Sequence, residues 1–202
     1  MMFGGFSHRS ERDEIIIAVA TLTVAFFIAY ARFGPVFRNP AAALILLIQS
    51  FLAVVGGFLF HELAHREVGR RFGGYTRFQM WPFGIFLALI TSLAGFIFAL
   101  PGAVTISGIY DRQSIGKVAA AGPGANLVFG LACLIIGALS AGIPVVGTTF
   151  IYLAQFSFYL GAFNMIPLGP LDGGKVMAWD FGRFVLLFAA LLLLAVISYT
   201  VF

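Results

Sequence analysis

The chain has 202 residues, of which 61% are hydrophobic and 10% are charged, and its mean hydropathy is +1.03. This composition excludes a soluble globular domain, whose charged fraction is nearer ~25%. The formal net charge of +4 is small and scattered, which gives no support to nucleic-acid binding, and the single cysteine excludes a disulfide framework. The chain is therefore expected to be a multi-pass protein of the lipid bilayer, with room for about five or six spans of ~20 residues.

The N-terminal part of the chain predicts a retained membrane anchor. Residues 15–31 form an apolar segment long enough to cross a bilayer. The polar tail before it contains Glu11, Asp13 and Glu14, whereas a cleavable signal peptide begins with a cationic region. We therefore expect this segment to remain in the mature protein.

The second predicted span, residues 41–69, contains the most informative motif. No charge occurs from Ala41 to Phe60, and then His61, Glu62 and His65 follow within five positions. Ionisable groups at membrane depth are costly unless they are paired, bind a metal or line a wet cavity. Residues four apart share one face of a helix, so both imidazoles point the same way with Glu62 beside them. This is the H-E-x-x-H zinc pattern, with a glutamate placed to act as general base.

The position of this motif predicts a metal site close to one face of the membrane. At 1.5 Å per residue, His61 lies about 30 Å along the helix from Ala41, near the far boundary of the hydrocarbon. A cluster of arginines follows directly, which is typical of the cytoplasmic side. An ordinary helix end whose polar side chains reach the interface is the weaker interpretation, because it leaves the cost of the ionisable groups unexplained.

The apolar segment 83–100 decides the predicted topology. It lies between two strand-like pieces, Tyr75–Trp81 and Ala103–Ser107, which together predict a small β-hairpin. If the segment re-enters and returns to the same side, ten of the twelve lysines and arginines lie on the cytoplasmic side; if it crosses, they divide six and six. The positive-inside rule favours the re-entrant alternative, whereas a continuous helix is the simpler local interpretation.

The remaining predicted spans are residues 118–140, 146–163 and 182–202. The first begins with small residues that allow another helix to approach closely, and it contains Asn126. This asparagine is expected to hydrogen-bond across helices, which is at least as plausible as a catalytic role. The whole pattern predicts one membrane-embedded domain, residues 1–202: an all-α, polytopic helix bundle with a small β-hairpin.

A broken segment, Asn164–Gly174, separates the last two spans. Two prolines and three glycines in eleven residues cannot continue a regular helix, and broken backbone at membrane depth is expected to line a cavity. It contains Asp172, the natural third ligand beside His61 and His65, because catalytic zinc takes three protein ligands. An aspartate next to two glycines also has an ordinary role as a turn former.

Three motifs in this order resemble the site-2 protease family of intramembrane zinc metalloproteases. They are the His61–His65 pattern, the helix start Ala121–Asn126, and Asn164 followed by Pro167 and Leu171-Asp172-Gly173. The resemblance implies one Zn²⁺ per chain, ligated by His61, His65 and Asp172, with Glu62 as catalytic acid and base and Asn164 as a further site residue. It also implies transmembrane proteins as substrates, cleaved near the cytoplasmic face of the cell membrane.

Two other classes of protein share some of these features with a protease. A membrane metal transporter would place paired histidines and an aspartate along an ion path, but the chain shows no internal repeat. A scaffold that binds transmembrane helices without cutting them would not need both the histidine pair and Glu62. The residues therefore favour an enzyme.

Overall fold

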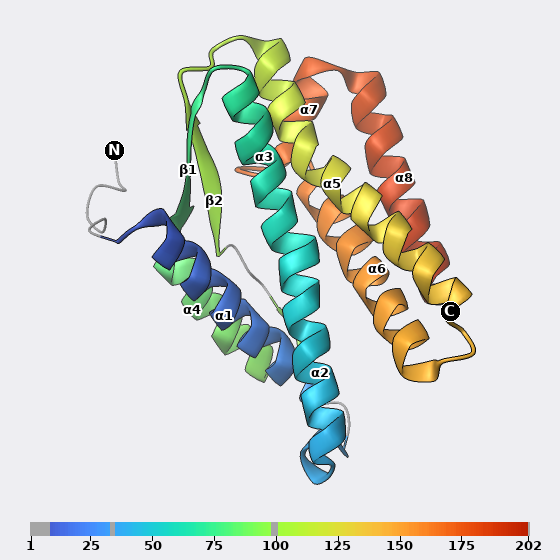
Figure 1. Cartoon of the computed structure of the whole chain (residues 1–202). Coiled ribbons are helices and arrows are strands. Elements are labelled where there is room, and N and C mark those ends of the chain that lie inside the picture. The colour runs from blue at the N-terminus through green and yellow to red at the C-terminus, as the bar shows by residue number, and fades with distance from the viewer. Residues whose placement is uncertain (1–8, 33–34, 98–100, 202) are drawn as a thin grey trace. The chain divides into compact units, whose positions relative to one another are not determined.

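The structure is a computed structural model that describes residues 9–32, 35–97 and 101–201. Residues 98–100, at the end of the predicted segment 83–100, and residue 202, the last of the span 182–202, lie outside these ranges. The elements are, in chain order (Figure 1), α1 (Glu11–Ala31), η1 (Pro35–Arg38), α2 (Pro40–Ala53), η2 (Val54–Leu59), α3 (Phe60–Arg71), β1 (Tyr75–Met80), α4 (Pro82–Leu93), β2 (Gly102–Ser107), α5 (Arg112–Leu139), α6 (Pro144–Asn164), α7 (Asp172–Trp179) and α8 (Phe181–Thr200).

Within the described ranges, five helices are long and apolar enough to cross a membrane. They are α1, the continuous helix Pro40–Arg71 formed by α2, η2 and α3, and then α5, α6 and α8. With the two-stranded sheet of β1 and β2, they confirm the predicted all-α, polytopic membrane fold with a small β element.

Two of these helices begin earlier than hydropathy predicts, because polar side chains cap them. The Ser10 hydroxyl accepts a hydrogen bond from the Asp13 N–H at 3.2 Å, so α1 begins at Glu11 instead of residue 15. The Asp111 carboxylate accepts from the Ser114 N–H at 2.8 Å, so α5 begins at Arg112 instead of residue 118. Such caps satisfy the free N–H groups of a first helical turn, which a hydrophobic pattern does not register.

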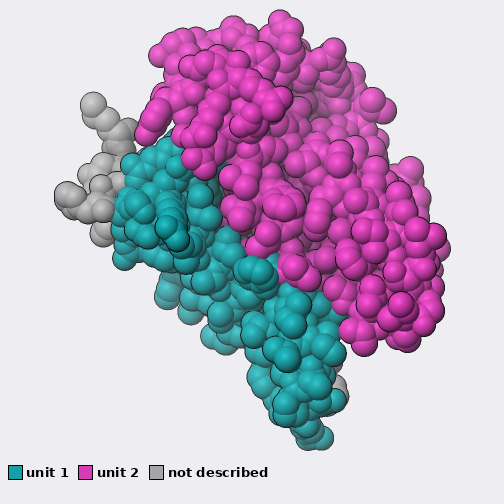
Figure 2. Space-filling view, in the orientation of Figure 1, with its two compact units in different colours: residues 1–51, 77–105 teal, residues 52–76, 106–202 magenta. Residues whose placement is uncertain are grey.

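The chain divides into two compact units, coloured separately in Figure 2. Unit 1 consists of residues 1–51 and 77–105, and unit 2 consists of residues 52–76 and 106–202. Unit 1 therefore contains α1, α4 and most of α2, whereas unit 2 contains α3 and α5 to α8.

In unit 1, α1 and α4 lie side by side and run in the same direction (Figure 1). Near their N-terminal ends, the Glu14 carboxylate accepts a hydrogen bond from the Met80 N–H at 2.8 Å. At their C-terminal ends, the Arg32 guanidinium donates to the Leu93 carbonyl. This carbonyl is one of the groups that the end of a helix leaves without a partner in the helix itself, so Arg32, the residue after α1, supplies a donor to the C-terminal end of α4.

Two carboxylates of α1 also hold strand β1. The Glu11 carboxylate accepts from the Phe78 N–H at 2.9 Å, and Glu14 accepts from the Arg77 guanidinium at 3.2 Å. Glu14 is buried, which corrects its expected place in a polar tail. Burial of a carboxylate is tolerated here because its oxygens are paired with a cation and a backbone donor.

The residues that flank the apolar segment 83–100 meet at one end of the two-stranded sheet. The Trp81 N–H donates to the Pro101 carbonyl at 2.9 Å, and the Thr105 hydroxyl donates to the Arg77 carbonyl at 3.0 Å, so β1 and β2 run antiparallel. Between them, α4 has twelve residues, about 18 Å of helix against ~30 Å of hydrocarbon. The chain thus leaves β1 along α4 and returns to β2 beside its starting point.

Unit 2 is built around α5, which packs against α3, α6 and α7, while α6 packs against α8 (Figure 1). Gly130 allows the close approach of α5 and α6, because a Cβ at this position would lie 2.4 Å from the Phe158 ring. Between α6 and α8, the Gln155 amide donates to the Ser198 carbonyl at 2.7 Å. Small residues and single polar contacts of this kind are how membrane helices associate.

The long helix Pro40–Arg71 changes its winding just before the histidine motif. In η2 the helix is of the π type, and the Phe60 N–H donates to the carbonyl of Val55, five residues back. Single π turns inside α-helices are uncommon and frequently accompany functional sites. The turn ends at Leu59, two residues before His61.

Candidate metal centre

Three side chains from α3 and α7 meet in the interior of unit 2. The Nε2 atoms of His61 and His65 lie 3.0 Å apart. The Asp172 Oδ2 atom lies 3.3 Å from the first and 3.0 Å from the second. All three residues are buried, and the cluster could hold a metal ion.

Asp172 reaches the histidines because the chain breaks its helix between α6 and α7. Pro167 and Pro170 lie in this connection, and Gly169 adopts φ +55°, a left-handed conformation that suits glycine. Asp172 is then the first residue of α7, where the helix N-terminus favours a negative charge. Its second oxygen, Oδ1, lies 3.5 Å from the Lys175 ammonium.

The carboxyl of Asp172 is set up as an anion. Burial by itself raises its pKa, but the two neighbouring imidazoles, when they are protonated and hold no metal, lower it by their charge and hydrogen bonds, and the balance holds the pKa well below the ordinary range. An ionised carboxylate and two imidazole nitrogens form the mixed oxygen and nitrogen donor set that zinc accepts.

Helix α5 contacts the Nδ1 atom of both imidazoles, the ring nitrogen that does not face Asp172. His61 Nδ1 lies 2.6 Å from Asn126 Oδ1, and His65 Nδ1 lies 2.7 Å from the Val118 carbonyl oxygen. Metal-ligating histidines usually donate their second ring N–H to such a partner, which fixes the ring orientation. Asn126 was expected to form an interhelical hydrogen bond or to have a catalytic role. The structure shows the interhelical hydrogen bond, and the residue that it joins to Asn126 is His61, a proposed metal ligand.

Gly122 leaves the space that a metal needs. A Cβ at this position would lie 2.3 Å from His65 Nε2 and 2.6 Å from His61 Nε2. Zinc binds imidazole nitrogen at about 2.0–2.1 Å, so a methyl group would intrude on the coordination sphere. The residues present therefore fit a zinc ion: three converging donors and a cradle that a Cβ would fill.

Sequence reasoning missed the functions of Val118 and Gly122, and did not connect Asn126 with His61. These three residues are spaced by four, so they share one face of α5. The spacing can be read from the sequence, but the sequence does not show that this face of α5 contacts α3.

Glu62 and Asn164, the two expected catalytic residues, differ in their surroundings. Glu62 is buried on α3, between the two histidines in sequence. Asn164 is half-buried at the end of α6, and its amide donates to the Leu160 carbonyl at 3.0 Å, in its own helix. The structure thus brings His61, His65 and Asp172 together, while the Asn164 donor is turned toward the α6 backbone.

Comparison with known proteins adds independent information. No protein-family model and no solved structure matches the chain. A protein of Methanocaldococcus jannaschii named "Putative zinc metalloprotease MJ0611" is 33% identical over 177 residues, which cover 85% of this chain and 86% of that protein. The chain belongs to the site-2 protease family of zinc metalloproteases.

Two further relatives agree with membership of the site-2 protease family. "Putative zinc metalloprotease Rip3" of Mycobacterium tuberculosis is 30% identical over 142 residues, or 68% of this chain and 30% of that protein. "Zinc metalloprotease MJ0392" of M. jannaschii is 27% identical over 135 residues, or 66% of this chain and 33% of that protein. The chain thus spans about a third of these two relatives. Zinc is the cofactor that this family implies, and the protein is a metalloprotease of a multi-pass membrane type.

Proposed function

We propose that the chain is an intramembrane endopeptidase that hydrolyses peptide bonds within the transmembrane segments of other membrane proteins. The observation that carries this proposal is the burial of His61, His65 and Asp172 together in unit 2, with both histidines on an apolar helix long enough to cross the bilayer. His61 follows Pro40 by 21 residues, or about 32 Å of helix, which puts it near the far hydrocarbon boundary. The three residues are the proposed zinc ligands.

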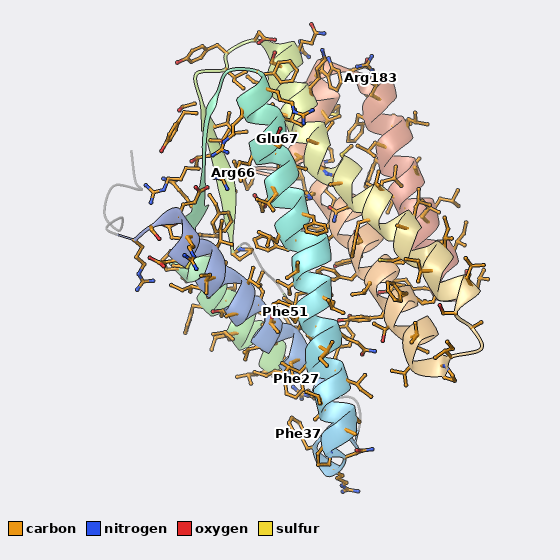
Figure 3. All side chains as sticks on the ribbon, viewed as in Figure 1. Phe27, Phe37, Phe51, Arg66, Glu67 and Arg183 are labelled. Atoms are coloured by element: carbon orange, nitrogen blue, oxygen red, sulfur yellow. The ribbon has the colours of Figure 1, made fainter. Side chains whose placement is uncertain are left out.

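We propose further that the metal faces the cytoplasmic side of the cell membrane. The return of the chain from α4 to the β-hairpin supports the re-entrant alternative, for which ten of twelve basic residues are cytoplasmic. In Figure 3, the labelled side chains of Arg66, Glu67 and Arg183 lie toward one end of unit 2. The whole chain, residues 1–202, acts as one membrane-embedded protease domain in this proposal, because the helix Pro40–Arg71 continues from one unit into the other.

The proposed chemistry assigns proton transfer to Glu62. Zinc, when bound, supplies a Lewis acid and activates water for attack. The Glu62 carboxylate takes the proton that this water gives up and delivers it to the leaving amine. Asn164 is proposed to donate a hydrogen bond to the substrate carbonyl, for which its amide must turn away from Leu160.

The substrate must unwind locally, because a helix hides its carbonyl groups in backbone hydrogen bonds. We propose that the unwound peptide pairs with an exposed edge of the two-stranded sheet of β1 and β2. On β1, the edge donors of Phe78 and Met80 are held by Glu11 and Glu14. A peptide that pairs with this stretch of β1 therefore has to displace these two carboxylates.

The test compares Glu62→Gln with wild type in detergent-purified protein, using a single-span membrane protein as substrate. Glu67→Gln is the matched control, because Glu67 lies on the same helix but is exposed and pairs with Arg71 at 2.9 Å. We expect about one zinc per chain in all three proteins and cleavage by wild type and Glu67→Gln alone. Mass spectrometry of the products should place the cut within the apolar segment of the substrate. Cleavage by Glu62→Gln would remove Glu62 from its role, and a cut confined to the soluble flanks would contradict intramembrane proteolysis.

A further inference from the structure

Asn126 lies at the centre of a closed hydrogen-bond network in unit 2. The residue is 0% exposed, and its side chain meets three partners. Its amide Nδ2 lies 2.9 Å from the Gly57 carbonyl and 3.2 Å from the Ser157 hydroxyl, while its Oδ1 lies 2.6 Å from His61 Nδ1. The Ser157 hydroxyl in turn donates to the Asn126 backbone carbonyl at 2.9 Å.

These partners allow only one orientation of the amide. A backbone carbonyl accepts hydrogen bonds and never donates, so the side of the amide that faces Gly57 must be the NH₂ group. The Ser157 hydroxyl gives its hydrogen to the Asn126 carbonyl, so toward the amide it also acts as an acceptor. The oxygen of the amide therefore faces His61.

The orientation of the amide fixes the tautomer of His61. An amide oxygen only accepts, so His61 Nδ1 must carry the hydrogen of their 2.6 Å contact. In the neutral ring, Nε2 then bears a lone pair, and this is the atom that faces Asp172 and His65. The Val118 carbonyl imposes the same tautomer on His65.

We propose that Asn126 is a positioning residue that selects the metal-binding tautomer of His61. The inference rests on the proposed function, in which His61 is a zinc ligand. The opposite tautomer would put a hydrogen on Nε2, where the metal binds, and would leave Nδ1 and Asn126 Oδ1 as two facing acceptors. Asn126 thus joins the metal centre to η2, through the Gly57 carbonyl, and to α6, through Ser157.

The experiment measures zinc affinity of metal-free, detergent-purified protein by competition with a chelator. Asn126→Leu removes the acceptor, and we expect zinc to bind about 10- to 100-fold more weakly. Asn126→Asp keeps an acceptor for His61 but loses both donors, and we expect an affinity within about threefold of wild type, as in carboxylate–histidine–zinc arrangements. Gln155→Leu is the matched control, because it removes an interhelical amide hydrogen bond to Ser198 away from the metal centre, and its zinc affinity should be unchanged.

Two results would overturn the inference. One is wild-type affinity in Asn126→Leu, and the other is equal loss in Asn126→Leu and Asn126→Asp, which would make Asn126 a purely interhelical contact. If wild type itself binds no zinc, the proposed function fails instead.

A second measurement needs no variant and therefore does not depend on how the substitutions fold. Nitrogen-15 NMR of histidine-labelled, metal-free wild type reports which ring nitrogen carries hydrogen, and the chain has only three histidines. At a pH high enough to keep the His61 ring neutral, we expect its Nδ1–H tautomer. Observation of the Nε2–H tautomer would overturn the inference even if zinc binds.

Discussion

Gly122→Ala is the substitution that most directly tests the metal centre. The new Cβ would lie 2.3 Å from His65 Nε2 and 2.6 Å from His61 Nε2, whereas ordinary van der Waals contact begins at 3.4 Å. One imidazole or the α5 backbone must therefore shift by about 1 Å. A displacement of that size in an active site lowers the reaction rate on the order of 100-fold. We expect zinc affinity to fall by at least that factor, and proteolysis with it.

Gly124→Ala is the matched control on the same helix. A Cβ at Gly124 meets nothing within 4 Å, so the alanine should leave zinc binding unchanged and stabilise α5 by about 0.5–1 kcal/mol. Zinc per chain, chelator competition and thermal unfolding are measured on both variants. Equal zinc affinity in the two folded proteins would refute the assignment of this space to the metal.

Three further predictions concern single carboxylates. Asp172→Ala should lower zinc occupancy, and unchanged metal content by elemental analysis would return Asp172 to the role of a turn residue. Glu14→Ala removes the acceptor of the Met80 N–H and should destabilise β1 by about 2 kcal/mol, seen as faster hydrogen exchange at Met80; wild-type exchange there would refute the contact's importance. The hydrogen bond from the Ser114 N–H lowers the pKa of Asp111 below its ordinary value of 3.8. The stabilisation of α5 by this cap is therefore complete above pH 3.8, and it is lost as the pH falls through the lower pKa that Asp111 has in the folded protein. In Asp111→Ala, this acid dependence of amide exchange in the first turn of α5 should disappear, and its persistence would assign it to another group.

The proximity of His61, His65 and Asp172 could be predicted because each of the signals for it is local. His61 and His65 are four residues apart on a helix, and Asp172 follows a break that prolines and glycines make visible. In the predicted re-entrant topology, the chain crosses the membrane once out and once back between His65 and Asp172, so both are expected at the same face. The structure places all three within 3.3 Å of one another.

The supporting contacts could not be predicted, because they depend on which helix faces pack together. Asn126 is 65 residues away from His61, and nothing in its neighbourhood specifies that partner. The π turn of η2 has no sequence pattern of its own, since its apolar residues and glycines also suit an α-helix. The burial of Glu14 was missed for the same reason: its partners, Arg77 and Met80, are more than sixty residues away.

The hydrogen bond between Arg32, which follows α1, and Leu93, which ends α4, has a consequence for how the protein is made. Helix α4 is too short to cross the hydrocarbon by itself, and in the proposed re-entrant topology its C-terminal carbonyls would have no water to bond. The Arg32 guanidinium, which donates to the last of these carbonyls, directly follows a span that the ribosome finishes some fifty residues before α4. In that topology α1 is already made when α4 leaves the ribosome, and α1 can act as an internal docking site for it.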